Sequence, residues 1–199
     1  RLFTASTHKG ATVNVYTYEP TDTVTVFSMN GATLSSFDGS KLLANMLSVR
    51  NAGLKQITMP ENKEFLREVN LSGNALSTFP INDFPNLYSL ALSDNQLTSL
   101  DLSQNESLNV VGVANNSIQS VTLKNPNLWF LDLSTNELTT IQVDTTTTPH
   151  LQQLGLSYNN LHTLDVASLD ELRVLSITNN YFDFSTLPPI LPQYSVYNY

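Results

Sequence analysis

Four aromatic residues stand at comparable points of a repeating pattern and could bind a ligand. Aromatic rings carry a large apolar area, anchor protein contacts and pack against sugar rings. Carboxylates and amides near them in the pattern could supply hydrogen bonds that select the ligand. The sequence therefore offers a candidate binding surface of Tyr88, Trp129, Phe130 and Tyr158, with Asp132, Asp94 and Asn109 as polar neighbours.

Catalytic and metal chemistry finds little support in the sequence. The three histidines, His8, His150 and His162, have no carboxylate paired with them at ligand spacing. The chain contains no cysteine, which removes disulfides, thiol catalysis and cysteine-based zinc sites. No nucleophile elbow, phosphate-binding glycine loop or zinc-protease motif occurs. We expect no enzymatic activity, no cofactor and no metal.

The charge of the chain limits its partners. The 199 residues carry a formal net charge of −8, and charged residues make up only 13% of the total. Nucleic-acid and anionic-membrane surfaces need clustered Lys and Arg, so neither is an expected partner. No apolar run approaches the roughly 18 residues of a membrane helix, so we expect no direct membrane insertion of this fragment.

A repeat of about 21 residues organises the chain. The pattern L-x-x-L-x-L-x-x-N-x-L is seen in "LYSLALSDNQL" (87–97) and "LWFLDLSTNEL" (128–138). Two weaker copies near the start have alanine, Ala32 and Ala52, at the asparagine position, which gives about eight units. The marker asparagines, spaced 20 to 23 residues apart, are Asn74, Asn95, Asn116, Asn136, Asn159 and Asn180.

The repeat predicts a stack of short strands. Alternation in L-x-L turns one face of each strand inward, and a single unit cannot bury that face alone. Stacked units pair their strands in a parallel sheet, and an asparagine at each turn can satisfy backbone groups. The return half of each unit has no helical periodicity, so we expect extended or 3₁₀ segments on the convex side. The residues between the leucines then project from the concave sheet.

These motifs resemble those of the leucine-rich-repeat family. The short unit is similar to the bacterial subclass called IRREKO and to surface or internalin-like leucine-rich-repeat proteins of the Bacteroidetes. The resemblance implies a right-handed solenoid of the β-rich α/β class, shaped as a horseshoe with little α-helix. It also implies non-catalytic binding through the concave face at the cell surface.

The ends of the chain depart from the repeat. We expect residues 1–23 to form a β-hairpin cap with a turn at Gly10, and residues 24–187 to form the repeats. Residues 188–199 are rich in Pro and Tyr and are expected to form a C-terminal cap or a linker.

The function expected from the sequence is binding of a protein or a glycan by the concave face of a monomer. The rival hypothesis is a structural or self-associating surface spacer without a soluble ligand. We expect an extracellular, cell-surface address, with a lipid anchor on a removed N-terminal segment as one option. The ligand itself cannot be named from the sequence.

Overall fold

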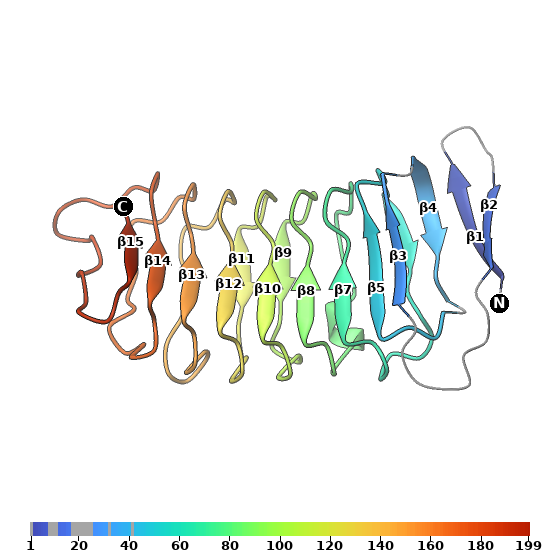
Figure 1. Ribbon diagram of the computed structural model, residues 1–199. Helices are drawn as coiled ribbons and strands as arrows, with labels where there is room; N and C mark the ends of the chain where they lie inside the picture. Colours follow the sequence, from blue (N-terminus) through green and yellow to red (C-terminus); the bar gives the residue numbers. More distant parts are fainter. Residues whose placement is uncertain (1, 8–11, 17–25, 32, 41) are drawn as a thin grey trace.

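The computed structural model describes residues 2–7, 12–16, 26–31, 33–40 and 42–199, and side chains within those ranges from residue 26 onward. Short strands lie side by side in a long stack, with the two termini at opposite ends (Figure 1). Each turn of the stack adds one strand to a large sheet, as expected for a chain whose leucine pattern repeats every 20 to 23 residues.

A nine-stranded parallel sheet, here called the main sheet, forms one side of the stack. Eight of its strands come from the region of the predicted repeats, and the ninth comes from the C-terminal tail. In spatial order the strands are β3 (Val26–Asn30), β5 (Met46–Arg50), β7 (Glu68–Asn70), β8 (Ser89–Ala91), β10 (Val110–Gly112), β12 (Phe130–Asp132), β13 (Gln153–Gly155), β14 (Val174–Ser176) and β15 (Val196–Asn198).

The return half of the repeats contains little regular structure. Figure 1 shows β9 and β11 behind the main sheet. The only helix within the described ranges is one 3₁₀ turn, as the absence of helical periodicity predicts. The elements of this side are β4 (Leu34–Asp38), β6 (Gln56–Thr58), η1 (Ile81–Asp83), β9 (Ser99–Asp101) and β11 (Ser120–Thr122).

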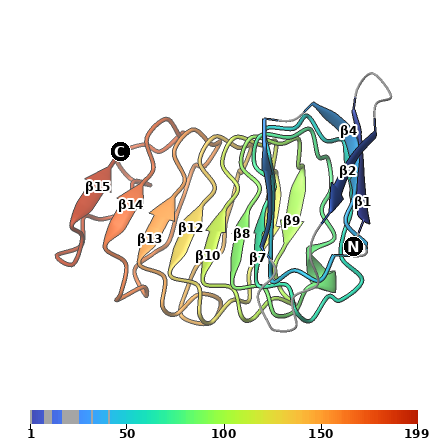
Figure 2. The same ribbon diagram turned by 45° about the vertical axis from the view of Figure 1, so that its right-hand side comes forward.

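The two N-terminal strands extend the sheet of the return half. β1 (Leu2–Thr7) pairs antiparallel with β2 (Thr12–Tyr16) and, on its other side, antiparallel with β4. The strand order is β2-β1-β4-β6, at the end of the stack seen on the right of Figure 2. The turn expected at Gly10 lies outside the described residues.

The C-terminal tail joins the main sheet. β15 pairs parallel with β14, and this register places Tyr197 beside Leu175. Tyr194 and Tyr199 stand three residues before and two residues after Tyr197, so the tail repeats the L-x-x-L-x-L spacing with tyrosines in place of leucines.

The leucines of each repeat form one continuous core. In the unit that starts at Leu87, the side chains of Leu87, Leu90 and Leu92 are fully buried. Removing a side chain of this size from water stabilises a fold by about 1.5–3 kcal/mol. The core therefore uses the inward side of every main-sheet strand, and only the outward side is left for other roles.

The marker asparagines hold the turns that follow the main-sheet strands. Asn136 Nδ2 donates to the carbonyls of Val113 and Leu133, and its Oδ1 accepts from the backbone N–H of Ile118. Asn95, Asn116, Asn159 and Asn180 repeat this pattern in their own units. At Ala52, where the asparagine is replaced, the backbone carbonyl accepts from Leu34 N instead.

The residue before each marker asparagine has a left-handed backbone. Non-glycine residues rarely adopt positive φ, because Cβ then crowds the carbonyl oxygen. Asn and Asp tolerate it best, yet Thr135 and Tyr158 also adopt it here. This left-handed column consists of Asn51 (φ 52°), Gly73 (73°), Asp94 (57°), Asn115 (54°), Thr135 (56°), Tyr158 (57°) and Asn179 (55°).

Candidate ligand-binding surface

The outward side of the main sheet presents two ordered columns of side chains. The residue before the central leucine of each strand forms the first column, and the residue after it forms the second. The register aligns Ser89, Val110, Phe130, Gln153 and Val174 in the first column. It aligns Ala91, Gly112, Asp132, Gly155 and Ser176 in the second.

Trp129 and Phe130 form the aromatic centre of this surface. Their ring centroids lie 5.9 Å apart, and the ring planes meet at 65°. Such an edge-to-face pair fixes both rings relative to one another. Both residues are only half-buried, so part of this aromatic surface remains in contact with solvent. The local sequence produces the pair because Phe130 begins the strand at an outward position and Trp129 directly precedes it.

Tyr88 and Asn109 lie on the same edge as Trp129, at the residues just before their strands. Backbone bonds run along this edge from Asn109 N to Tyr88 O and from Trp129 N to Asn109 O. Tyr88 is 48% exposed. Asn109 Nδ2 donates to Ser107 O at 2.9 Å, so this amide is already used in part. Tyr88 and Trp129 share an edge, with one repeat between them.

Asp132 is a half-buried outward residue of β12. Its Oδ1 accepts from the backbone N–H of Ser134 at 3.0 Å, which holds the carboxylate against its own strand. The carboxylate also occupies the space beside Gly155, where a Cβ would meet Oδ1 at 2.6 Å. Asp132 therefore keeps a fixed position next to the aromatic pair, with its second oxygen as the remaining acceptor.

Asp94 and Tyr158 lie at the opposite edge, in the left-handed column. Asn115 Nδ2 donates to Asp94 Oδ1 at 2.5 Å, so this carboxylate is engaged across the repeats. Tyr158 is 59% exposed. The seven predicted residues thus lie on one side of the sheet, in three groups along the strand direction. Tyr88, Asn109 and Trp129 lie just before the strands, and Phe130 and Asp132 lie within β12. Asp94 and Tyr158 lie in the turns after the strands.

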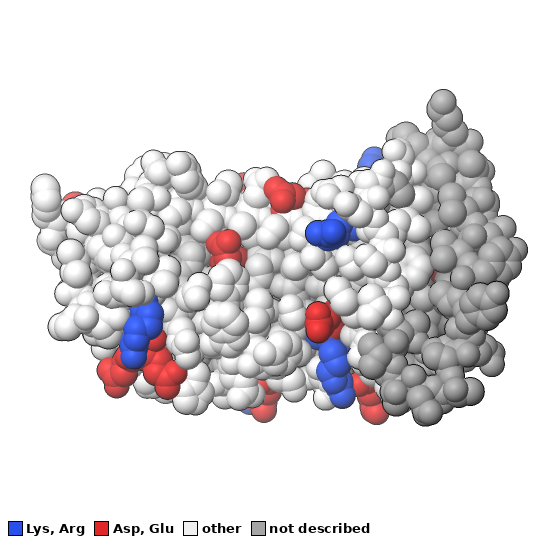
Figure 3. Space-filling model, in the orientation of Figure 1, with Lys and Arg blue, Asp and Glu red and all other residues white. Residues whose placement is uncertain are grey.

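Charged side chains are sparse on this surface. Figure 3 shows the described part of the main-sheet side as largely uncharged, with a few charged residues on the face and several along its lower edge. The described ion pairs each join neighbouring repeats away from the outward columns: Lys63–Asp83, Lys124–Glu106 and His150–Glu171. The surface is therefore suited to stacking and hydrogen bonding more than to ionic recognition.

One of these pairs corrects the sequence analysis. His150 does have a carboxylate partner, because Nδ1 lies 2.9 Å from Glu171 Oε1 in the next repeat. Sequence spacing missed the pair because 21 residues separate its members, and only the stacking of repeats brings them together. The hydrogen bond from His150 lowers the pKa of Glu171. His162 instead stacks on Tyr181, with ring centroids 5.3 Å apart.

Metal ligands do not converge in the part of the chain that the structure describes. No group of three or more His, Asp or Glu residues there could hold an ion. Among the same residues, no helix has the length and apolar character that a membrane crossing requires.

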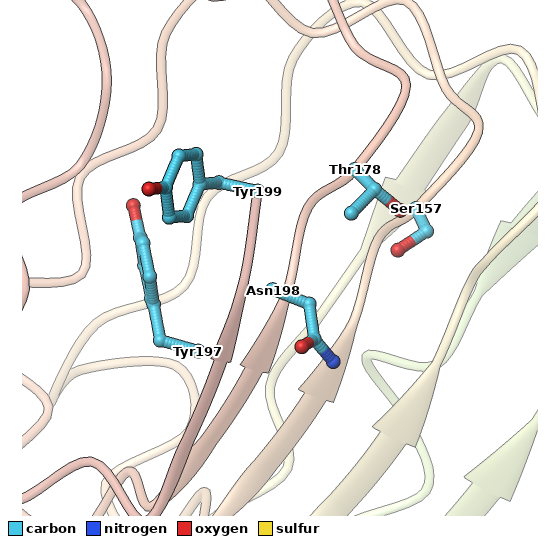
Figure 4. A pocket seen from close by; sticks show the side chains of 5 residues that line it. All are labelled: Ser157, Thr178, Tyr197, Asn198 and Tyr199. Atoms are coloured by element: carbon cyan, nitrogen blue, oxygen red, sulfur yellow. The ribbon is translucent and has the colours of Figure 1, made fainter.

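A cleft that the sequence analysis did not anticipate lies at the C-terminal end of the main sheet. It has a volume of about 410 Å³ and is lined by Ser157, Thr178, Tyr197, Asn198 and Tyr199 (Figure 4). The tyrosines at leucine positions in "YSVYNY" (194–199) are the signal that could have revealed it.

Comparisons with known proteins agree with this geometry. The Leucine Rich Repeat family matches residues 65–87, which is about one repeat. The human and mouse oligodendrocyte-myelin glycoproteins are 31% identical over 148 residues, which cover 71% of this chain. The same alignment covers 32% of each glycoprotein, so the chain spans about a third of the length of these relatives.

Solved bacterial structures share the architecture. A leucine-rich-repeat protein of Leptospira interrogans is 26% identical, with a TM-score of 0.66, over 77% of this chain and 43% of that one. YopM of Yersinia enterocolitica is 25% identical, with a TM-score of 0.63, over 76% and 32%. The functional domain of InlJ from Listeria monocytogenes is 24% identical, with a TM-score of 0.59, over 77% and 39%. By its fold, the chain is a leucine-rich-repeat solenoid.

Proposed function

We propose that this protein is a non-catalytic interaction module whose main-sheet side binds a protein or glycan ligand. The observation that carries the proposal is the half-exposed Trp129–Phe130 pair on a sheet surface with few charged side chains. Aromatic anchors beside small residues are typical of binding surfaces. Ala91 and Gly112 lie two strands and one strand away from Asp132 in the second column, so a ligand can approach the backbone there.

The extent of the surface favours a protein as the ligand. The strands that carry Tyr88 and Tyr158 are three steps apart in the sheet, which is roughly 14 Å at the usual strand spacing. The two residues also lie at opposite edges of the sheet. A ligand that contacts both edges and the centre must be larger than a single sugar. Proteins with this fold commonly act as scaffolds for protein contacts, which supports the same reading.

The proposal also covers the cellular location of the protein and the boundaries of its segments. We propose export to the cell surface, and membership of the short-repeat bacterial subclass with units of about 21 residues. The low share of charged residues and the regular spacing of the repeats support both. We also propose three segments: an N-terminal cap in residues 1–23, repeats in 24–187, and a C-terminal cap or linker in 188–199.

The test is a binding comparison between matched variants. The whole chain is probed on an array of extracellular proteins and on an array of defined glycans, alongside Trp129→Ala, Tyr88→Ala and Tyr181→Ala. Tyr181 is an exposed tyrosine that stacks on His162 outside the two columns. Its replacement therefore shows whether removing an exposed aromatic ring elsewhere on the protein also weakens binding. We expect the first two variants to lose binding by about tenfold or more, and Tyr181→Ala to retain it.

Further measurements distinguish this proposal from its rival, the self-associating spacer. Trp129 is the only tryptophan, so a bound ligand should shift its fluorescence emission. Thermal unfolding of each variant must stay close to that of the parent, which separates lost contact from lost folding. If every ligand on the arrays binds Trp129→Ala and Tyr88→Ala as well as the parent, the aromatic surface is not the binding site. Dimers in sedimentation that Trp129→Ala dissolves would support the self-associating spacer instead.

A further inference from the structure

The C-terminal cleft is made by a repeat in which tyrosines replace leucines. The register pairs Leu175 with Tyr197, and Ile177 N donates to Asn198 O at 2.7 Å, which carries the pairing on toward Tyr199. Tyr197 lies in β15, which is the last strand in the spatial order of the main sheet among the described residues, and Tyr199 follows it. The tail therefore continues the sheet while changing the chemistry of its surface.

The tyrosine rings are held in place before any ligand arrives. Tyr197 OH donates to Pro188 O at 2.8 Å. Its ring stacks on Tyr194, with centroids 5.6 Å apart and planes 6° from parallel. On its other side it meets Tyr199 at 5.4 Å and 37°. A ring fixed in this way loses little conformational freedom on binding, which favours affinity.

Tyr199 offers the exposed face of this stack. It is 71% exposed, whereas Tyr194 and Tyr197 are half-buried. Figure 4 shows the rings of Tyr197 and Tyr199 on one side of the cleft and Ser157 and Thr178 across from them. The cleft thus has an aromatic wall and a polar wall.

The polar wall presents neutral groups. Asn198 Nδ2 donates to Ser176 Oγ at 3.2 Å, which fixes the amide and leaves Oδ1 as an acceptor. Among the described residues, the hydroxyls of Ser157, Thr178 and Tyr199 make no hydrogen bond to other protein groups. Three hydroxyls and one amide oxygen can pair with a ligand that is rich in hydroxyl groups.

The lining contains no charged side chain. A phosphate or carboxylate ligand would therefore find no cationic side chain there. The volume of about 410 Å³ lies within the usual range of small-molecule sites, about 300–1,000 Å³. A sugar ring fits both walls, because its C–H face can lie on an aromatic ring while its hydroxyls reach hydroxyl and amide partners.

We infer that this cleft binds a neutral saccharide of one or two rings, with Tyr199 as the stacking platform and Asn198 as the fixed acceptor. The site is distinct from the Trp129 surface, because β12 and β15 are three strands apart in the sheet, roughly 14 Å. The cleft adds a second binding site to the one in the proposed function, and it does not depend on that function.

The test uses the whole chain and named probes. An array of neutral glycans is followed by saturation-transfer NMR with methyl glucosides, methyl mannosides, N-acetylglucosamine and lactose. We expect at least one probe to bind. Tyr199→Ala should weaken that probe by about tenfold, which corresponds to about 1.4 kcal/mol, because the stacked ring is lost. Tyr199→Phe should keep most of the affinity, and Asn198→Ala should reduce it.

The controls separate this site from the aromatic surface. Tyr181→Ala should bind the sugar as the parent does, and Tyr199→Ala should melt at the parent temperature because its ring is exposed. The inference is overturned if no neutral sugar binds, or if Tyr199→Ala and Asn198→Ala bind it unchanged. Loss of sugar binding in Trp129→Ala alone would also overturn it, since the sugar would then occupy the aromatic surface.

Discussion

The carboxylate of Asp132 occupies the space that a side chain at Gly155 would need. A Cβ at Gly155 would stand 2.6 Å from Asp132 Oδ1 and 3.0 Å from Ser134 Oγ, on the neighbouring strand. The glycine is therefore the partner of the aspartate, and the second column is filled at this point. Gly112, in the same column, is open by contrast, since a Cβ there would meet only Ser93 Oγ at 3.8 Å.

This relationship predicts that Gly155→Ala destabilises the protein. Real Cβ atoms do not approach an oxygen to 2.6 Å, so Asp132 must move and lose its bond from Ser134 N. We expect a loss of about 1 kcal/mol in the free energy of unfolding, measured in urea, because one hydrogen bond is lost. Gly112→Ala is the matched control and should be neutral or slightly stabilising. The double variant Asp132→Ala/Gly155→Ala should recover stability relative to Gly155→Ala, and additive losses would contradict the pairing.

The left-handed column predicts a stabilising substitution. Thr135 has φ 56°, where a β-branched side chain is strained, while Asn115 and Asn179 serve the same position elsewhere. Thr135→Asn should raise the free energy of unfolding by up to about 1 kcal/mol. The control is Thr140→Asn, an exposed threonine outside the positive-φ set, which should change little. A Thr135→Asn variant that unfolds earlier than the parent would show that the threonine contributes contacts that outweigh its backbone strain.

The marker asparagines predict a large and local loss. Asn136→Ala removes the groups that satisfy the Val113 and Leu133 carbonyls and the Ile118 N–H. Because these backbone groups have little access to water, the cost should be about 2–4 kcal/mol by chemical unfolding. Asn127→Ala is the control, since Asn127 is exposed and makes one bond to Glu106 O. If Asn136→Ala and Asn127→Ala lose the same free energy of unfolding, the structural role assigned to Asn136 is wrong.

The turn at Asp183 predicts a pH dependence at acid pH. The carboxylate accepts from the Ser185 hydroxyl and from the N–H groups of Ser185 and Thr186, which lowers the pKa of Asp183 below 3.8. Because folding favours the charged form, its contribution is present above pH 3.8 and is lost as the pH falls through the folded pKa. Carboxyl ¹³C NMR should show Asp183 titrating below 3.8 and moving toward 3.8 in Ser185→Ala. A midpoint at or above 3.8 in the parent would contradict the turn.

The repeat pattern was sufficient to predict the architecture. Leucine spacing and the asparagine interval predicted a parallel sheet with an extended return side, and β8, β10 and β12 lie where the pattern places them. A periodic chain permits this because each unit contacts only its neighbours, so local spacing determines the global arrangement. The role of the asparagines followed from the same logic, since buried backbone groups must find partners.

The candidate surface was predicted as a set of columns, but its detail was not. Sequence alone placed Trp129 and Phe130 next to each other on the outward side, but could not reveal their edge-to-face contact. It also gave no sign that the carboxylate of Asp132 fills the space beside Gly155. Rotamers depend on neighbours in adjacent repeats, and no single repeat contains that information.

By itself, the sequence determined the solenoid, its inward leucines and the side of the sheet on which the candidate binding residues lie, because these follow from local periodicity. Only the tertiary structure decided which side chains remain available to a ligand. In it, Asp94 accepts a hydrogen bond from Asn115, and His150 pairs with Glu171. Ser157 and Thr178 line a cleft together with the C-terminal tail. The physical reason is that each of these relationships crosses from one repeat to the next. Contacts between residues about 20 positions apart form only when the repeats stack.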